Sequence, residues 1–105
     1  MHNLILRKDL DHLDLSDMGE PIPPVTPGDV LRAEFMEPLR LSAHALAKAV
    51  GVPTNRITAI LHATRGITAD TALRLGAQFG TSAEFWMNLQ VAYDLEIARE
   101  RAAAA

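Results

Sequence analysis

The chain has 105 residues, a mass of 11.4 kDa, a formal net charge of −3 and hydrophobic residues at 49% of its positions. This size predicts a single domain, and the absence of cysteine excludes disulfide scaffolds, thiolate metal sites and thiol catalysis. The sequence has neither a signal-peptide core nor an apolar run of the roughly 18 residues that a membrane helix needs. We therefore expect a soluble, cytoplasmic protein without a membrane partner.

The charge is unevenly distributed along the chain. Residues 1–25 carry two basic and five acidic side chains, residues 26–75 carry six and four, and residues 76–105 carry two and four. No acidic residue occurs between Glu37 and Asp70. The net charge taken alone argues against nucleic-acid binding, but a basic segment between two acidic ones is typical of a surface that faces phosphates.

The N-terminal segment, residues 1–25, is acidic and ends in Pro21-Ile22-Pro23-Pro24, which no regular element tolerates well. We interpret it as a flexible arm, because chain termini are commonly loose. Leu6, Leu10 and Leu13 nevertheless fall at helical spacing. A short amphipathic helix that orders against a partner is the alternative interpretation.

The remaining sequence predicts five helices and no strand. Capping residues mark the starts, prolines and glycines mark the ends, and no internal repeat occurs. The first helix begins at Thr26-Pro27 and should end near Glu37, because Pro38 follows. The others are expected over residues 43–50, 54–63, 69–79 and from 83 into the alanine tail. The predicted fold is an all-α, five-helix bundle, with a domain over residues 26–101 and an alanine tail over 102–105.

The segment from Ser42 to Ala63 reads as helix, glycine turn, helix. Two short helices joined by a tight turn that begins with glycine form a helix-turn-helix, whose second helix lies in the DNA major groove. In the second helix Ile57, Ile60 and Leu61 define a buried stripe at 100° per residue. The opposite side has no acid and no large apolar residue.

Polar side chains on and around this second helix are the candidate DNA contacts. Asn55 can pair with adenine, Arg56 can reach guanine or a phosphate, and Ala59 permits close approach. The predicted base-reading residues are Thr54, Asn55, Arg56, Thr58, Ala59 and His62. The predicted phosphate contacts are Ser42, His44, Lys48 and Arg65. Each charged residue could equally belong to an ordinary solvated helix face. The two histidines have no metal-ligand spacing, and we expect neither metal nor cofactor.

The last helix carries two apolar stripes. One consists of Trp86, Leu89, Tyr93 and Ile97, and the other of Met87, Val91 and Leu95. A helix that is apolar over so wide an arc packs on two sides. We assign Phe85 and Trp86 to the core of the domain. We assign Met87, Val91, Tyr93 and Leu95 to a homodimer face, which a helix-turn-helix protein needs to bind two half-sites.

Several segments together resemble the HigA (VapI-like) antitoxins of bacterial type II toxin–antitoxin systems, within the phage-repressor-like (XRE/Cro, lambda-repressor-like) helix-turn-helix class. They are Thr26-Pro27-Gly28-Asp29-Val30-Leu31, the helix-turn-helix from Leu41 to Ile57, the stretch from Arg65 to Leu75, and the stretch from Phe79 to Gln90 with its Trp-x-Asn-Leu-Gln pattern. The likeness spans about residues 22 to 97. The acidic arm before Pro21 is extra, and Thr58, Ala59 and His62 occupy variable positions of the family.

The resemblance implies a dimeric repressor that binds the promoter of its own operon and neutralises a HigB-type toxin, a ribosome-dependent mRNA interferase. It implies no catalytic activity and no small-molecule substrate. A solitary repressor without a toxin is the alternative hypothesis, and a protein-interaction module without DNA binding is a third. The acidic arm is also a candidate contact for a basic toxin.

Overall fold

A computed structural model describes residues 24–104, so the predicted arm lies almost entirely outside the described residues. Three consecutive elements open the fold, namely α2 (Pro27–Val30), the π-helical η2 (Leu31–Met36) and α3 (Glu37–Leu39), and they form one continuous first helix. The other helices are α4 (Ala43–Val50), α5 (Thr54–Leu61), α6 (Ala69–Phe79) and α7 (Ala83–Ala104). Residues 24–104 contain no strand, which confirms the all-α, five-helix prediction.

Side-chain caps start most of these helices where the sequence predicts. Thr26 Oγ1 accepts from Asp29 N at 3.0 Å, while the Asp29 carboxylate accepts from Thr26 N at 3.2 Å, which is a capping box. Ser42, Thr68 and Ser82 each accept from the backbone N–H three residues on. These caps satisfy N–H groups that have no partner within the helix.

The first helix continues past Pro38 to Leu39, so the predicted end near Glu37 is wrong. Glu37, the residue before the proline, keeps helical angles of φ −62° and ψ −47°. The preceding turn, from Leu31 to Met36, is of the wider π type. We attribute the continuation to this turn, because a widened helix relieves the clash between a proline ring and the carbonyl four residues earlier. The helix ends at Arg40, which is left-handed with φ 54°.

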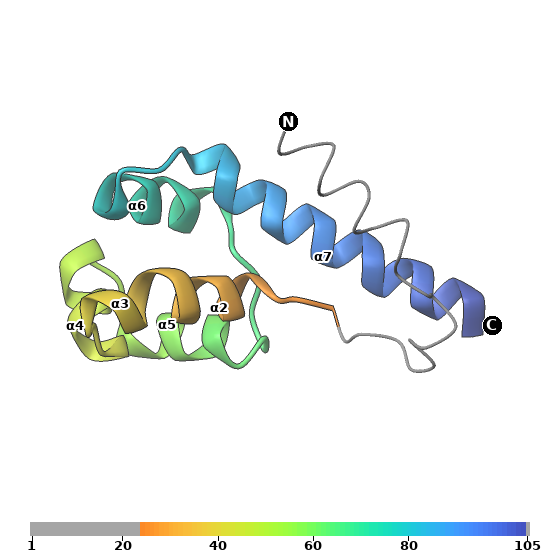
Figure 1. Ribbon diagram of the computed structural model, residues 1–105, viewed down its shortest axis with the longest axis horizontal. Helices are drawn as coiled ribbons and strands as arrows, with labels where there is room; N and C mark the ends of the chain where they lie inside the picture. Colours follow the sequence, from red (N-terminus) through yellow and green to blue (C-terminus); the bar gives the residue numbers. More distant parts are fainter. Residues whose placement is uncertain (1–23, 105) are drawn as a thin grey trace, which may run out of the picture.

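The core lies where the first helix, α4, α5, α6 and the start of α7 meet. Its fully buried side chains are Leu31, Leu46, Ile57, Ile60, Leu75 and Trp86, with Thr71 among them. Figure 1 shows α6 and the first part of α7 on one side of this core and the first helix, α4 and α5 on the other. The helices α4, α5 and α6 each bury one face of the helix, whereas α7 fully buries only Trp86.

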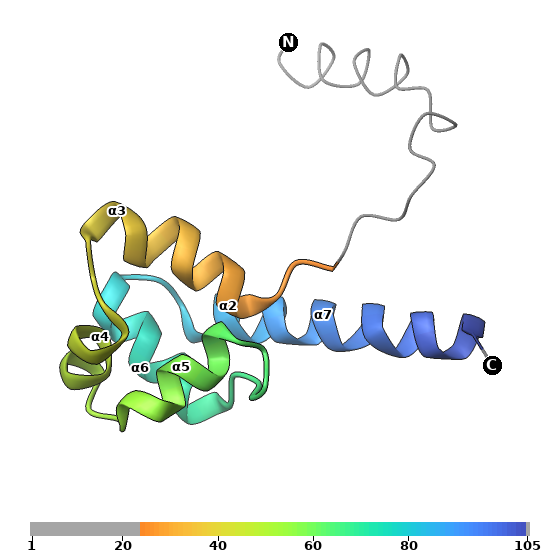
Figure 2. The ribbon, with the colours of Figure 1, turned by 90° about the horizontal axis from the view of Figure 1, so that it is seen from below.

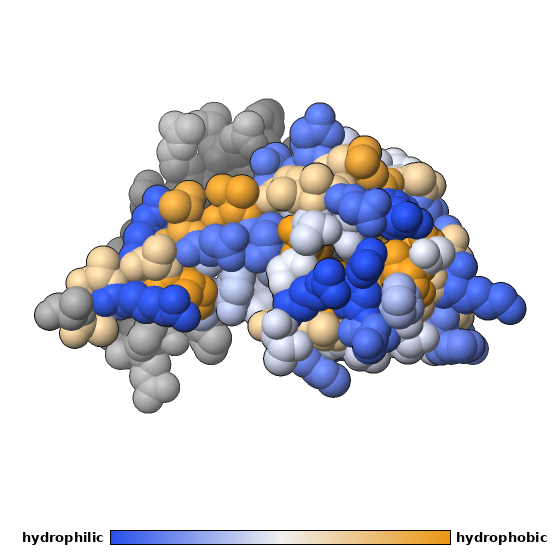
Figure 3. Space-filling model, turned by 180° about the vertical axis from the view of Figure 1, so that it is seen from behind, coloured by the Kyte–Doolittle hydropathy of each residue, from blue (hydrophilic) through white to orange (hydrophobic). Residues whose placement is uncertain are grey.

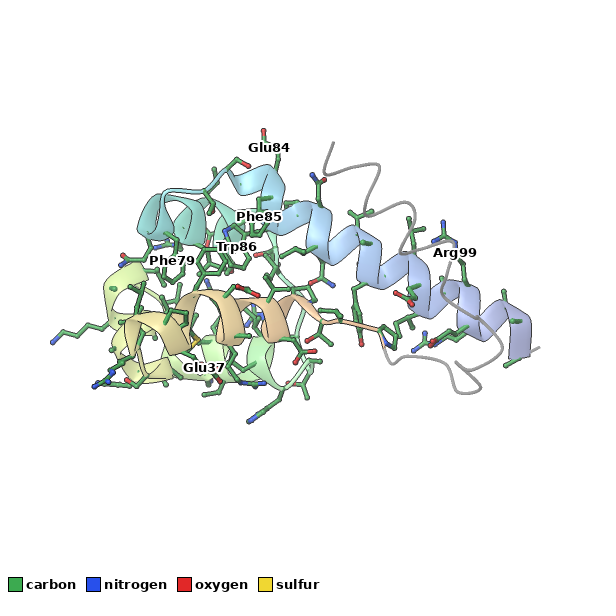
Figure 4. The ribbon with its side chains drawn as sticks, in the orientation of Figure 1. Glu37, Phe79, Glu84, Phe85, Trp86 and Arg99 are labelled. Atoms are coloured by element: carbon green, nitrogen blue, oxygen red, sulfur yellow. The ribbon has the colours of Figure 1, made fainter. Side chains whose placement is uncertain are left out.

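Aromatic side chains join the first helix to α6 and α7. The Phe35 ring lies 4.9 Å from Phe79 and 5.0 Å from Trp86, and the Phe85 ring lies 5.0 Å from Trp86. Trp86 Nε1 donates to Thr81 Oγ1 at 2.8 Å, so its buried polar atom is satisfied. Figure 4 shows Phe79, Phe85 and Trp86 between these helices. The core assignment of Trp86 is confirmed, and Phe85 packs half-buried against the same core.

The second half of α7 projects away from the bundle. Figure 2 shows α7 as a long rod whose C-terminal part extends beyond the other helices. Within residues 24–104 no helix combines the length and apolarity that a bilayer crossing requires. The helix continues through Ala104 into the predicted alanine tail.

Candidate nucleic-acid interface

The turn between α4 and α5 has the geometry of a helix-turn-helix. Gly51 adopts the left-handed conformation, with φ 78°, and its N–H donates to Ala47 O at 2.9 Å. Val52 N donates to the same carbonyl at 3.0 Å, and α5 begins after Pro53. A left-handed residue at this place favours glycine, because a Cβ atom makes the conformation costly. The predicted turn is therefore present between these helices.

The exposed face of α5 carries the predicted base-reading residues. Ile57 and Ile60 are buried, while Asn55 and His62 are exposed and Thr54, Thr58 and Ala59 are half-buried. The Thr58 hydroxyl donates to the backbone carbonyl of Asn55 at 3.2 Å. The Asn55 side-chain amide makes no hydrogen bond to another of the described residues. The helix ends at Leu61 rather than near the predicted residue 63, because Ala63 is left-handed with φ 59°.

Arg56 turns towards α6 rather than towards solvent. Its side chain is 26% exposed, and Nη1 donates to Asp70 Oδ2 at 3.3 Å. A base contact by Arg56 would therefore require that this ion pair break. The remaining predicted base-reading side chains are not tied to another helix in this way, except Thr54, whose Oγ1 lies 3.2 Å from His44 Nδ1 on α4.

The predicted phosphate contacts lie at or on α4 and in the loop that follows α5. Lys48 is exposed on α4, and Arg65 is exposed in the loop that follows α5. Ser42 and His44 lie at the N-terminal end of α4, where the backbone N–H groups favour an anion. Figure 3 shows the molecule from behind, where hydrophilic and hydrophobic side chains alternate over the bundle.

The first helix fixes the far end of α5. Gly28 packs so closely that a Cβ built there would lie 2.2 Å from Ile60 O and 2.9 Å from Leu61 Cα. Arg32 Nη2 donates to Leu61 O at 3.0 Å, which satisfies a carbonyl at the helix end. The sequence did not predict this support. The Pro-Gly start of the first helix was the available signal, but its partner is about thirty residues away in the chain.

The loop after α5 is fastened to α7. Gln90 Oε1 accepts from Ile67 N at 2.8 Å, and Gln90 Nε2 donates to Asp94 Oδ1 at 2.8 Å. Beside these contacts lies an open hollow of about 180 Å³, lined among others by Thr26, Arg65 and Tyr93. The position of Arg65 next to α5 thus depends on α7 as well as on the helix-turn-helix.

The predicted dimer face divides into two parts. Val91 and Leu95 are 50% and 47% exposed on the projecting part of α7. Met87 is half-buried and packs against the core, and Tyr93 is half-buried beside the hollow. Figure 3 shows hydrophobic surface along the projecting part of α7. An exposed apolar stripe of this kind is typical of a surface that binds another protein chain. Met87 differs from Val91 and Leu95 because it also packs against the core of its own domain.

No family model matches this chain, but several individual proteins are similar to it over most of its length. Virulence-associated protein I of Dichelobacter nodosus is 53% identical over 79 residues, which is 75% of this chain and 73% of that protein. Antitoxin HigA-1 of Vibrio cholerae is 40% identical over 78 residues, which is 74% of this chain and 73% of that protein.

Solved structures agree with this relationship. Antitoxin HigA of Pseudomonas aeruginosa with the higBA promoter superposes with a TM-score of 0.74 at 44% identity, over 77% of this chain and 88% of that one. Antitoxin GraA in complex with its operator superposes with a TM-score of 0.73 at 41% identity, over 89% of both chains. This chain therefore belongs to the HigA family of helix-turn-helix antitoxins.

Proposed function

We propose that this chain is a DNA-binding antitoxin, which acts in the cytoplasm as a dimer, represses its own operon and neutralises a HigB-type mRNA interferase. The observation that carries the DNA-binding part is the exposed face of α5, which follows a helix-turn-helix turn and bears no acid. Two related structures, of HigA and GraA, contain promoter or operator DNA. Their similarity over most of the chain supports the same use of α5 here.

In this proposal Asn55 is the principal base-reading residue. It is exposed in the first turn of α5, the part of a recognition helix that reaches base edges, and its amide can pair with adenine in both directions. His62, Thr54, Thr58 and Ala59 complete the contacting face. Lys48 and Arg65 hold phosphates, with Ser42 and His44 at the start of α4. Arg56 joins them only if its pair with Asp70 opens.

The dimer would form through the projecting part of α7. Val91 and Leu95 lie one helical turn apart and leave about half of their surfaces exposed, and Tyr93 and Met87 flank them. Two-fold symmetric operators match two-fold symmetric proteins, with half-sites about 34 Å apart along the duplex. A DNase footprint on the chain's own promoter should therefore protect two related half-sites.

Toxin neutralisation is tested by co-expression with the product of the adjacent gene. The protein is co-expressed with the product of the neighbouring reading frame, purified by affinity and assayed for rescue of growth. A stable complex that abolishes toxicity is the expected result. A neighbour that is toxic but neither bound nor neutralised would refute the antitoxin part of the proposal.

A solitary repressor is the second candidate function. An HTH-type transcriptional regulator of Escherichia coli is 43% identical to this chain over 72 residues, which is 69% of this chain and 64% of that protein. The same co-expression experiment separates the two functions. Promoter binding together with a harmless, unbound neighbour would favour the solitary repressor.

A further inference from the structure

Asp70, in the first turn of α6, accepts from two arginines with the same oxygen. Arg74 Nε donates to Asp70 Oδ2 at 3.0 Å from one turn further along α6. Arg56 Nη1 donates to Asp70 Oδ2 at 3.3 Å from α5. One carboxylate thus joins the recognition helix to α6.

Arg74 also reaches the turn of the helix-turn-helix. Its Nη1 donates to Val50 O at 2.8 Å and to Gly51 O at 3.5 Å. Gly51 is the left-handed residue between α4 and α5, and Val50 is the last residue of α4. The Asp70 cluster, which we define as Arg56, Asp70 and Arg74, therefore connects the end of α4, the start of α5 and the start of α6.

The geometry keeps Arg56 on the protein side of α5. Only 26% of its side chain is exposed, and its Nε atom is buried without a hydrogen-bond partner. The neighbouring Ile57 is fully buried, so the backbone at this place is fixed by the core. Reaching the DNA would cost Arg56 its ion pair and its packing.

We propose that Asp70 is a positioning residue, which sets the orientation of α5 against the helix-turn-helix turn, and that Arg56 acts through Asp70 instead of reading bases. This inference rests on the proposed DNA binding. The physical basis is that the side chains of the Asp70 cluster hydrogen-bond to one another and to the end of α4. Side chains joined in such a network can adopt fewer orientations than the two side chains of an isolated ion pair. From the sequence alone, Asp70 is predicted only to be an acidic residue in the first turn of a helix, where it suits the helix dipole.

Direct reading and positioning predict opposite effects of Asp70→Asn. If Arg56 read a base or phosphate, the loss of Asp70 would free it, and operator affinity would stay equal or rise. If Asp70 positions α5, Asp70→Asn lowers affinity for the operator about tenfold, the scale of coupling between residues in one network, while affinity for a shuffled duplex does not fall. The removal of a negative charge alone would instead raise affinity for both duplexes.

The experiment measures both affinities by fluorescence anisotropy for wild type, Asp70→Asn, Arg56→Ala and the double variant. We expect the double variant to discriminate no worse than either single variant, because both disrupt one cluster. Asp70→Glu, which keeps the carboxylate, should restore most of the lost discrimination. Glu84→Gln is the matched control, since this acid is exposed at the start of α7, away from the Asp70 cluster. An Asp70→Asn variant that discriminates as well as wild type would overturn the inference.

Two further measurements keep the test decisive. Circular dichroism at the assay temperature establishes that each variant is folded, and Asp70→Ser, which also removes the carboxylate, serves if Asp70→Asn is not. NMR of the Arg56 Nη–H groups gives a readout without DNA, because Nη1 donates to Asp70, and their solvent exchange should accelerate about tenfold or more in Asp70→Asn, on the scale of the same coupling. If wild type itself fails to distinguish operator from shuffled DNA, the proposed function fails. The positioning role then stands or falls on this exchange rate.

Discussion

Replacement of Gly28 by alanine should destabilise the protein, because the space for a Cβ atom is already occupied by the backbone of α5. The added Cβ would lie 2.2 Å from Ile60 O and 2.9 Å from Leu61 Cα. Both neighbours are backbone atoms of α5, so no side chain can rotate away. The first helix and α5 must separate by more than 1 Å to restore ordinary contact, and the bond from Arg32 to Leu61 O at 3.0 Å lengthens with them.

Overpacking of this kind costs about 1–3 kcal/mol, against a gain of about 0.5–1 kcal/mol because alanine favours helix over glycine. Because the clash is with backbone atoms, we place the overpacking cost at the upper end of this range and expect a net loss of about 2 kcal/mol in the free energy of unfolding. Urea denaturation followed by circular dichroism measures it. Operator affinity should fall as well, because α5 is the element displaced.

Gly66→Ala is the matched control. The nearest atoms to its Cβ would be those at the end of the Gln90 side chain, at 3.1 Å, which need to shift by only a few tenths of an ångström against their bonds to Ile67 and Asp94. We expect a loss well below that of Gly28→Ala. Equal unfolding midpoints for Gly28→Ala and wild type would refute the close approach of the first helix to α5, and with it this explanation of how α5 is held.

Four other substitutions test separate parts of the structure. Lys48→Ala should weaken binding to operator and shuffled DNA alike and reduce the salt slope by about one; an anisotropy series in salt that shows loss on the operator alone would contradict a phosphate contact. Leu95→Glu should give a monomer in sedimentation equilibrium, and an intact dimer would place the interface elsewhere. Ala63→Gly should raise stability by about 1 kcal/mol, because φ 59° disfavours a Cβ; a lower melting temperature would contradict this. Trp86→Phe loses the bond to Thr81 and core volume, at a cost of about 1–3 kcal/mol, and an unchanged urea midpoint would show the bond to be dispensable.

Local chemistry made much of the fold predictable. Thr26, Ser42 and Thr68 cap helices with their own side chains, and Gly51 ends α4 in the left-handed conformation. These signals involve residues within one turn of each other, so the sequence displays them directly. The same holds for the buried stripe of α5, whose period is visible without a structure.

Long-range contacts were not predictable in this way. Asp70 and Arg74 stand at the spacing of a helical ion pair, but nothing in the sequence indicates that Arg56 or the Val50 carbonyl joins them. Gly28 reads as a helix-start residue, and its contact with α5 depends on how two helices cross. The first helix continues past Pro38 because a π-type turn precedes the proline, and no local sequence motif indicated that turn.

The central claim is that the exposed face of α5 recognises a specific DNA sequence. Its most direct test is a titration of the wild-type protein with its own promoter and with a shuffled duplex of equal length at one physiological salt concentration. We expect the affinity for the promoter to be at least about 10³-fold higher than for the shuffled duplex, the usual lower bound for specific binding. We also expect Asn55→Ala to remove much of that ratio. Equal affinity of the wild-type protein for both duplexes would contradict the claim.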